Sequence, residues 1–184
     1  MRKMIISVLG KDRPGIIAAV TRILFDHGGN IENISQTILQ NEFSGIFIVT
    51  LPDTLSDSAL HQHLVDGLAH MGLHVYEKQI DDAADTGPGG DSEPFVVTAK
   101  GPDRKGLVAS ITAILAKYQV NVSNLWAMFR GGVDPGDNIM IYEVDIPLSV
   151  DHAALRRELS EKAKALHLDI SIQHQRIFEA LNRI

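Results

Sequence analysis

The sequence predicts an α+β protein made of two copies of one βαββαβ unit, each a four-stranded antiparallel sheet with both helices on one face. Two observations carry this prediction. Residues 10–35 and 101–126 align without a gap, with ten identical positions out of 26. Within each copy, short runs rich in β-branched residues alternate with stretches whose apolar residues recur at helical spacing. This element order is that of the ferredoxin-like fold.

The two copies are separated by a segment of different composition. Residues 82–94 are acidic, rich in Gly and Pro, and nearly devoid of large apolar side chains. Such a segment buries too little surface to offset its ordering entropy. We therefore expect a first domain at 1–81, a flexible linker at 82–94 and a second domain at 95–184.

In the first copy, the pattern predicts strands at about 3–9, 30–41, 44–51 and 73–80, with helices at about 14–27 and around 60–71. One face of the first helix is apolar except for its last member; it comprises Ile16, Val20, Ile23, Leu24 and His27. We expect Pro14 in the first turn of this helix and Asp12 or Arg13 at its cap. The two middle strands are expected to form a hairpin around Asn41 and Gly45.

Composition excludes several classes of function. The 184 residues carry a formal charge of −6 and no cysteine, so disulfides, thiolate metal sites and a cysteine nucleophile are ruled out. No basic run is longer than two residues, which predicts no direct nucleic-acid binding. The apolar run Met4–Leu9 is too short for a signal segment or a membrane span. These features together lead us to expect a cytoplasmic protein with no membrane association.

The first strand-to-helix turn recurs as Gly10-Lys-Asp-Arg-Pro-Gly15 and Gly101-Pro-Asp-Arg-Lys-Gly106. Glycine lets a ligand approach the backbone, and the following helix start attracts a carboxylate. An aspartate accepts from an ammonium, and the asparagine that begins the next strand is expected beside the turn. The candidate ligand residues are Gly10, Asp12, Arg13, Gly15 and Asn30, with Gly101, Asp103, Arg104, Gly106 and Asn121. The alternative is a tight turn with an aspartate cap and no ligand.

The turn, the helix and the Asn-Ile that follows resemble the ACT domain, a small regulatory module that binds amino acids. Residues 33–40 and 172–184 resemble a bacterial family with a single ACT domain, and the tandem arrangement without an enzyme resembles the glycine cleavage system transcriptional repressor family. The resemblance implies a non-enzymatic sensor of a small amino acid, glycine or similar, that acts through a protein partner. It places ligand contacts at Gly10, Asp12 and Asn30 and at their counterparts Gly101, Asp103 and Asn121.

Some details depart from that family. Gly10 and Gly101 stand where serine-binding members carry histidine, and Asp12 and Asp103 stand where they carry asparagine, which does not favour serine as the ligand. Lys105 stands where proline is usual, so the second turn is expected to be looser.

Other chemistries lack support in the sequence. The eight histidines show no i, i+4 pair with a fixed carboxylate, so we expect solvated or capping side chains, no metal and no cofactor. No Gly-x-Ser-x-Gly motif is present. The RNA-recognition module shares the βαββαβ order, but residues 44–49 lack its basic residue and its first stacking ring, and residues 139–144 carry an acidic residue. A ligand-free adaptor that binds another protein remains the main alternative.

The C-terminal segment 177–184 predicts a short helix with an apolar stripe of Ile177, Leu181 and Ile184, with Phe178 alongside. Eight residues do not hold a helix alone in water. We therefore expect this segment to dock on the other copy or on a second chain, and to support a homo-oligomer.

Overall fold

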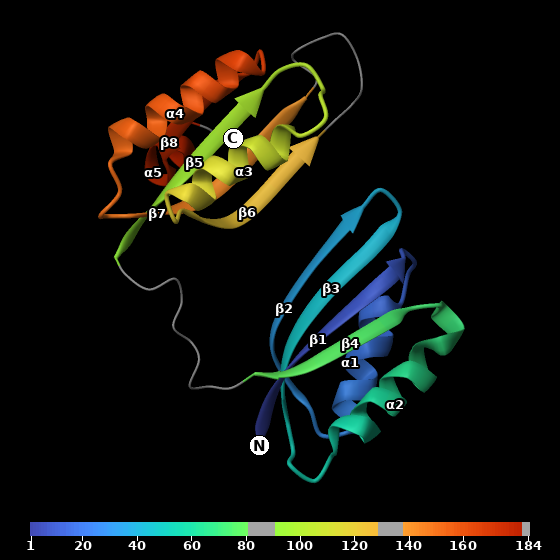
Figure 1. Cartoon of the computed structure of the whole chain (residues 1–184). Coiled ribbons are helices and arrows are strands. Elements are labelled where there is room, and N and C mark those ends of the chain that lie inside the picture. Colours follow the sequence, from blue (N-terminus) through green and yellow to red (C-terminus); the bar gives the residue numbers. More distant parts are fainter. Residues whose placement is uncertain (81–90, 129–137, 182–184) are drawn as a thin grey trace. The chain divides into compact units, whose positions relative to one another are not determined.

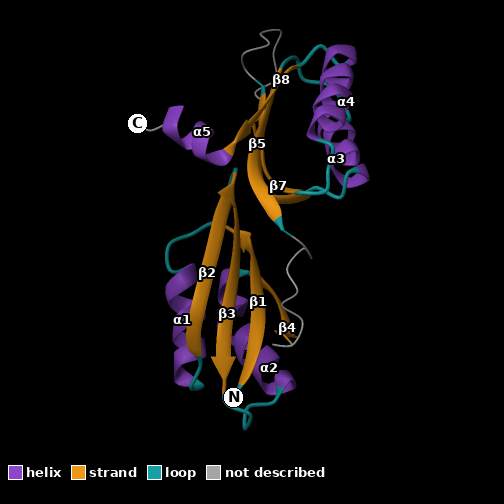
Figure 2. Ribbon diagram, turned by 90° about the vertical axis from the view of Figure 1, so that its left-hand side faces the viewer, coloured by secondary structure: helices purple, strands orange, loops and turns teal. Residues whose placement is uncertain are grey.

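The computed structural model describes residues 1–80, 91–128 and 138–181. The chain divides into two compact units, Met1–Thr86 and Gly87–Ile184. Each unit is a four-stranded antiparallel sheet with two helices packed on one face (Figure 1, Figure 2). The predicted α+β class and the βαββαβ order are therefore confirmed in both units.

The first unit has the sheet order β2-β3-β1-β4, so that β1 and β3 lie in the centre and β2 and β4 at the edges. Its elements are β1 (Arg2–Lys11), α1 (Ile16–Asp26), β2 (Asn30–Leu39), β3 (Glu42–Leu51), α2 (Asp57–Leu68), a short 3₁₀ helix (Ala69–Met71) and β4 (His74–Ile80).

The second unit repeats this topology with the order β6-β7-β5-β8. Its elements are β5 (Ser92–Lys100), α3 (Leu107–Lys117), β6 (Asn121–Met128), β7 (Ile139–Pro147), α4 (His152–Ala165), β8 (Asp169–His174) and α5 (Gln175–Leu181). Only α5 has no counterpart in the first unit among the described residues.

The core of the first unit lies between its helices and one face of its sheet. Helix α1 buries Ile16, Val20 and Leu24, which confirms the predicted apolar face, and α2 buries Leu60, Leu64 and Leu68. They pack on alternate residues of β1 and β3, which are Met4, Ile6, Val8, Phe43, Phe47 and Val49. Because strand side chains alternate between faces, the residues between these point to the other face of the sheet, which the two helices do not cover.

The start of α1 differs from the prediction. Gly15 is the N-cap, with a left-handed backbone (φ 96°), and the helix begins at Ile16. Asp12 and Arg13 are therefore not caps, and Pro14 precedes the helix. Gly106 has the same role and a similar φ of 85° before α3. A residue with a side chain rarely adopts this conformation, so these two glycines set where each helix begins.

The β2–β3 hairpin turns at Gln40 and Asn41, so the predicted place of Asn41 in the turn is confirmed. Gly45, which was also expected there, is not in the turn. Gly45 lies inside β3, opposite Val8 of β1. A Cβ atom there would lie 2.7 Å from Cζ of Phe43, which is closer than packing allows. Gly45 is therefore a packing residue of the sheet, where two buried phenylalanine rings leave no room for a side chain.

The expected linker, residues 82–94, ends earlier than predicted at its C-terminal side. Strand β5 begins at Ser92, and Ser92 and Pro94 pair with Pro147 and Asp145 of β7. Residues 92–94 have no apolar pattern that would predict a strand. Backbone pairing with β7 orders them instead. The rest of the expected linker, 82–91, lies almost entirely outside the described residues.

Helix α5 packs against β5 and β8, on the face of the second sheet opposite α3 and α4 (Figure 2). The described part of the C-terminal segment therefore docks on the sheet of its own unit, an arrangement that the expected alternatives, the other copy and a second chain, did not include. Phe178 is partly buried there, whereas the side chain of Ile177 is 54% exposed and does not dock. Ile184 lies outside the described residues.

Candidate functional site

Both strand-to-helix turns are held in place by backbone contacts. In the first unit, the Asp12 amide donates to the carbonyl oxygen of Asn41 in the hairpin turn (2.8 Å), and in the second, the Gly101 amide donates to the carbonyl oxygen of Asn138 (3.2 Å). These bonds tie each turn to the neighbouring hairpin. Sequence reasoning did not identify Asn41 or Asn138 as neighbours of the turns, because strand pairing brings them there.

The helices that follow the turns begin without a side-chain cap. Ser56 caps α2 by accepting from the Ala59 amide, and Asp151 caps α4 by accepting from the Ala153 and Ala154 amides. Gly15 and Gly106 supply no such acceptor at α1 and α3. The first amides of these two helices are therefore left to water or to an anionic ligand, and the helix dipole adds a partial positive charge there.

The charged residues of the turns are exposed and uncommitted. The side chains of Asp12, Arg13, Asp103 and Arg104 make no hydrogen bond or ion pair to any other residue that the structure describes. Each turn thus presents a carboxylate, a guanidinium and uncapped helix amides within a few residues of chain. These groups match the ammonium and the carboxylate of a free amino acid.

Asn30 and Asn121 are not beside the turns. Asn30 pairs with Thr50, and Thr50 pairs with Lys3 at the beginning of β1, whereas the turn follows Gly10 at its end. Seven residues of strand separate these two positions along β1, which is about 23 Å at 3.3 Å per residue. The expectation that the asparagine adjoins the turn was wrong, because α1 carries the chain back along the whole sheet before β2 begins. Asn121, paired with Asp145 near the start of β5, repeats this geometry.

Each unit has a shallow depression on its helix side. One, of about 590 Å³, lies between α1 and β2 and is lined by Asn30, Thr21 and Arg22 among others. The other, of about 540 Å³, runs between α3 and α4 and includes Gly106 and Glu158. Hydrogen bonds from the Lys117 ammonium and the Tyr118 hydroxyl lower the pKa of Glu158 and keep it ionised. Glu158 is thus already engaged and does not complement the turn.

The described residues contain neither a candidate metal site nor a candidate membrane-spanning helix. Within residues 1–80, 91–128 and 138–181, no group of three or more His, Asp or Glu side chains is placed to hold a metal ion. In the same residues, no helix has the length and apolarity needed to cross a membrane.

The open sheet faces do not resemble an RNA-binding surface. An RNA-recognition module stacks bases on aromatic rings of its central strands. The rings on β3 and β7 here, Phe43, Phe47 and Tyr142, all face the core and are at most 2% exposed. The open face of β7 instead presents Glu143 beside Val96, and a carboxylate there repels phosphate.

The chain matches known proteins along most of its length. The ACT domain model matches residues 2–76 and 93–128, more than half of the chain. A UPF0237 protein of Methanopyrus kandleri is 34% identical over 82 residues, which cover 44% of this chain and 91% of that protein. A UPF0237 protein of Corynebacterium diphtheriae is 48% identical over 82 residues, 43% of this chain and 92% of that protein.

Two solved structures share the fold over both units. A protein of Galdieria sulphuraria superposes with a TM-score of 0.76 and 22% identity, covering 94% of this chain and 98% of that one. A putative glycine cleavage system transcriptional repressor superposes with a TM-score of 0.68 and 19% identity, covering 94% and 96%. With two βαββαβ units and a domain match in each, the chain belongs to the ACT domain family and carries two ACT domains in tandem.

Proposed function

We propose that this protein is a non-enzymatic regulator that binds a small amino acid, glycine or similar, at its two strand-to-helix turns and acts through a protein partner. The observation that carries the proposal is the repeated Gly-x-Asp-Arg-x-Gly turn, which leads in both units into a helix with no side-chain cap. The ACT domain is a regulatory fold related to amino-acid-binding regulators, and that relation supports the same reading.

In the proposed site, different protein groups bind the carboxylate and the ammonium of the ligand. In the first unit, the uncapped amides of α1 and the nearby Arg13 bind the carboxylate, and Asp12 binds the ammonium. In the second unit, the amides of α3 with Arg104 bind the carboxylate, and Asp103 binds the ammonium. Gly10 and Gly101 keep the turn close to the sheet, and Gly15 and Gly106 aim the helix amides. Asn30 and Asn121 are too far away to join the same ligand within a unit, and so are not part of the proposed turn site.

The regulated process is proposed from a structural likeness. A putative glycine cleavage system transcriptional repressor has the same fold over both units, and on this likeness we place the protein in the transcriptional control of amino-acid and one-carbon metabolism. With a net charge of −6, it would act on transcription through another protein in the cytoplasm rather than by contacting DNA, and as a homo-oligomer.

Isothermal titration of the full chain against the twenty amino acids tests the ligand. We expect glycine or another small amino acid to bind, and the double variant Asp12→Asn with Asp103→Asn to weaken it at least about tenfold, the effect of one charge-assisted hydrogen bond. The matched control is Asp66→Asn with Glu93→Gln; Glu93 is exposed and lies near the start of β5, at the opposite end of that strand from the Gly101 turn. Absence of heat with every amino acid at millimolar concentration would contradict the proposal.

A ligand-free adaptor is the second candidate, favoured by the open sheet face of the first unit. Leu9, Ile46 and Tyr76 point to that face and are 51%, 42% and 68% exposed. Exposed apolar side chains on one surface mark sites of protein contact. A pull-down from native cytoplasm, with and without each small amino acid, separates the two: a partner whose capture does not depend on any amino acid favours the adaptor.

A further inference from the structure

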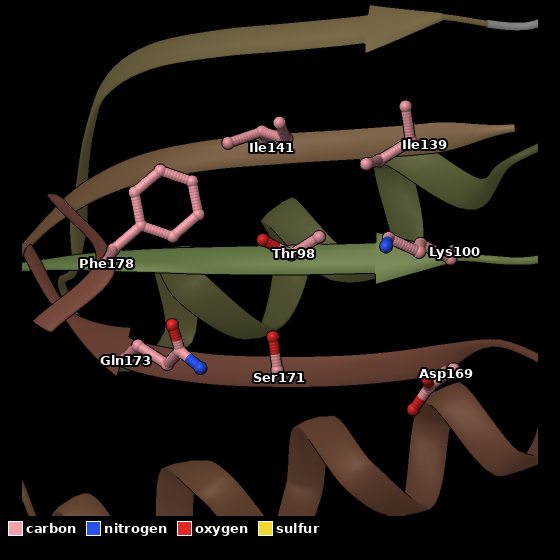
Figure 3. A pocket seen from close by; sticks show the side chains of 8 residues that line it. All are labelled: Thr98, Lys100, Ile139, Ile141, Asp169, Ser171, Gln173 and Phe178. Carbon is pink, nitrogen blue, oxygen red and sulfur yellow. The ribbon is translucent and has the colours of Figure 1, made fainter. Parts of the chain in front are cut away.

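The second unit has a pocket on its open sheet face, on the side away from α3 and α4. Its volume is about 350 Å³, at the small end of the range of ~300–1,000 Å³ that is typical of small-molecule sites. Eight residues line it, and Figure 3 shows them: Thr98, Lys100, Ile139, Ile141, Asp169, Ser171, Gln173 and Phe178. The size suits a single amino acid better than a nucleotide.

The lining is divided by strand. Ile139 and Ile141 on β7 form an apolar side, and Ser171 and Gln173 on β8 form a polar side (Figure 3). Phe178 of α5 closes one end. The arrangement therefore favours an amphipathic molecule with its apolar part against β7 and its polar part against β8.

Opposite charges lie together at the other end of the pocket. Lys100 of β5 and Asp169 of β8 are direct cross-strand partners, so their Cβ atoms are about 5 Å apart. Neither side chain has an ion-pair partner among the residues that the structure describes. The α-ammonium and α-carboxylate of a free amino acid are adjacent, and this pair of charges matches both at once.

The three uncharged polar side chains are also uncommitted. Within the described part of the chain, the side chains of Thr98, Ser171 and Gln173 make no hydrogen bond. Polar groups that converge on one pocket without using each other are available to a ligand. No other pair of charges in the pocket competes for the ammonium or the carboxylate.

The first unit does not have this site. On its open face the position of Lys100 is held by Leu9 and that of Asp169 by His74, because these residues occupy the same places in the pairing of β1 with β4. Among its described residues, the first unit has no helix that corresponds to α5 and could cover this face. The charged pair and its covering helix thus occur together in the second unit only.

We propose that this pocket binds an α-amino acid with an apolar side chain, with Asp169 taking the ammonium, Lys100 the carboxylate, and the side chain lying on Ile139, Ile141 and Phe178. The site lies on the opposite face of the sheet from the helix that the Gly101–Gly106 turn begins. It prefers a larger apolar amino acid to glycine, and it can therefore be tested apart from the turns.

Isothermal titration of the full chain with leucine, 4-methylpentanoate and 3-methylbutylamine tests the assignment. The second compound lacks the ammonium and the third lacks the carboxylate. We expect leucine to bind, and each analogue to bind at least about tenfold more weakly, because one charge of the pair is left unmatched. Equal binding of leucine and either analogue, or no binding of leucine at millimolar concentration, overturns the proposal.

Variants distinguish this pocket from the turns. Lys100→Met and Asp169→Asn should each weaken leucine at least about tenfold, whereas the controls Lys164→Met and Glu161→Gln on α4 should not. Asp103→Asn in the turn should leave leucine binding intact. If leucine binding is instead lost in Asp103→Asn and kept in Lys100→Met, leucine occupies the turn and the pocket assignment is wrong.

A second measurement does not depend on heat. Arg176 on α5 is exposed, so trypsin reports the opening of this helix. Leucine bound beneath Phe178 should slow cleavage after Arg176, and the effect should disappear in Asp169→Asn. Cleavage at the same rate with and without leucine overturns the proposal even if leucine binds elsewhere on the chain.

Discussion

A Cβ atom on Gly10 would lie 2.8 Å from Cδ2 of Leu73 and 3.2 Å from the carbonyl oxygen of Gly72. The second unit repeats this relationship: a Cβ on Gly101 would lie 2.7 Å from Cδ2 of Leu168 and 2.8 Å from the carbonyl oxygen of His167. In both units the end of the first strand therefore touches the backbone that leads into the last strand. Glycine is required at this position by packing, whether or not a ligand binds there.

Alanine at Gly10 or Gly101 is therefore expected to lower the free energy of unfolding by about 1–3 kcal/mol, as overpacked sites do. The contact includes backbone atoms that cannot move aside, so relaxation is limited. Urea unfolding measures the effect. The control is Gly67→Ala in α2, where the added methyl meets only the far end of the Ile23 side chain and alanine also favours the helix. Unfolding unchanged by Gly10→Ala would show that the strand end can shift.

Most of the fold could be predicted from the sequence because it depends on periodicity. The buried residues of α1 and α2 repeat at helical spacing, and the repeat itself gave the domain order. The helix start was misplaced because a left-handed glycine, Gly15, and not an aspartate, is the N-cap. Gly45 was misplaced because a strand glycine looks like a turn glycine until the rings of Phe43 and Phe47 are seen beside it.

The candidate site was predictable only in part. The turns lie in one short stretch of sequence, so their residues had to be close. Asn30 is near the turn in sequence but at the far end of the sheet, since the helix between them spans its length. The pocket beneath α5 was not predictable, because it unites Lys100 with Asp169 and Phe178, residues that only strand pairing and the docking of α5 bring together.

The separation of Asn30 from the turn has a testable consequence. Asn30→Ala and Asn121→Ala should leave amino-acid affinity unchanged, whereas Asp12→Asn and Asp103→Asn should lower it at least about tenfold. Titration calorimetry with the best-binding small amino acid measures all four variants. A loss of affinity in Asn30→Ala as large as that in Asp12→Asn would mean that the ligand site is not built within one unit.

Tyr142 should make the second unit sensitive to alkaline pH. Burial raises the pKa of Tyr142 from 10.0 to about 12. Because the folded pKa is the higher one, the stability that depends on the neutral phenol is complete below pH ~10 and is lost as the pH rises toward 12. At a pH of about 11 this loss is about 1.4 kcal/mol.

The substitution Tyr142→Phe removes the titrating group. Raising the pH from about 8 to 11 should lower the free energy of unfolding of the parent protein more than that of this variant, as measured by urea unfolding. Tyr76→Phe is the control, since Tyr76 is 68% exposed. Its pH dependence should match that of the parent. An equal alkaline loss in the parent and in Tyr142→Phe would place the sensitivity in the lysines instead.

The acidic balance predicts that the purified protein does not retard DNA. A net charge of −6 and the lack of a basic run longer than two residues give it no surface that releases counterions from phosphates. A gel shift at physiological salt, with and without the small amino acid that binds, checks this. Retardation of a specific promoter fragment by the protein alone would contradict it and remove the need for a protein partner.

Helix α5 is expected to stabilise its own unit without holding copies together. Val96 points to the open face of the second sheet yet is only 3% exposed, and α5 contacts its strand. Removing residues 175–184 should expose Val96 and lower the melting temperature. Size-exclusion chromatography should report the same number of chains in the assembly before and after truncation. Phe178→Ala should cost about 1–2 kcal/mol, and Ile177→Ser, at a residue 54% exposed, should cost little. A fall in mass after truncation would instead show that α5 holds two chains together, and its docking on its own sheet would then not explain its apolar residues.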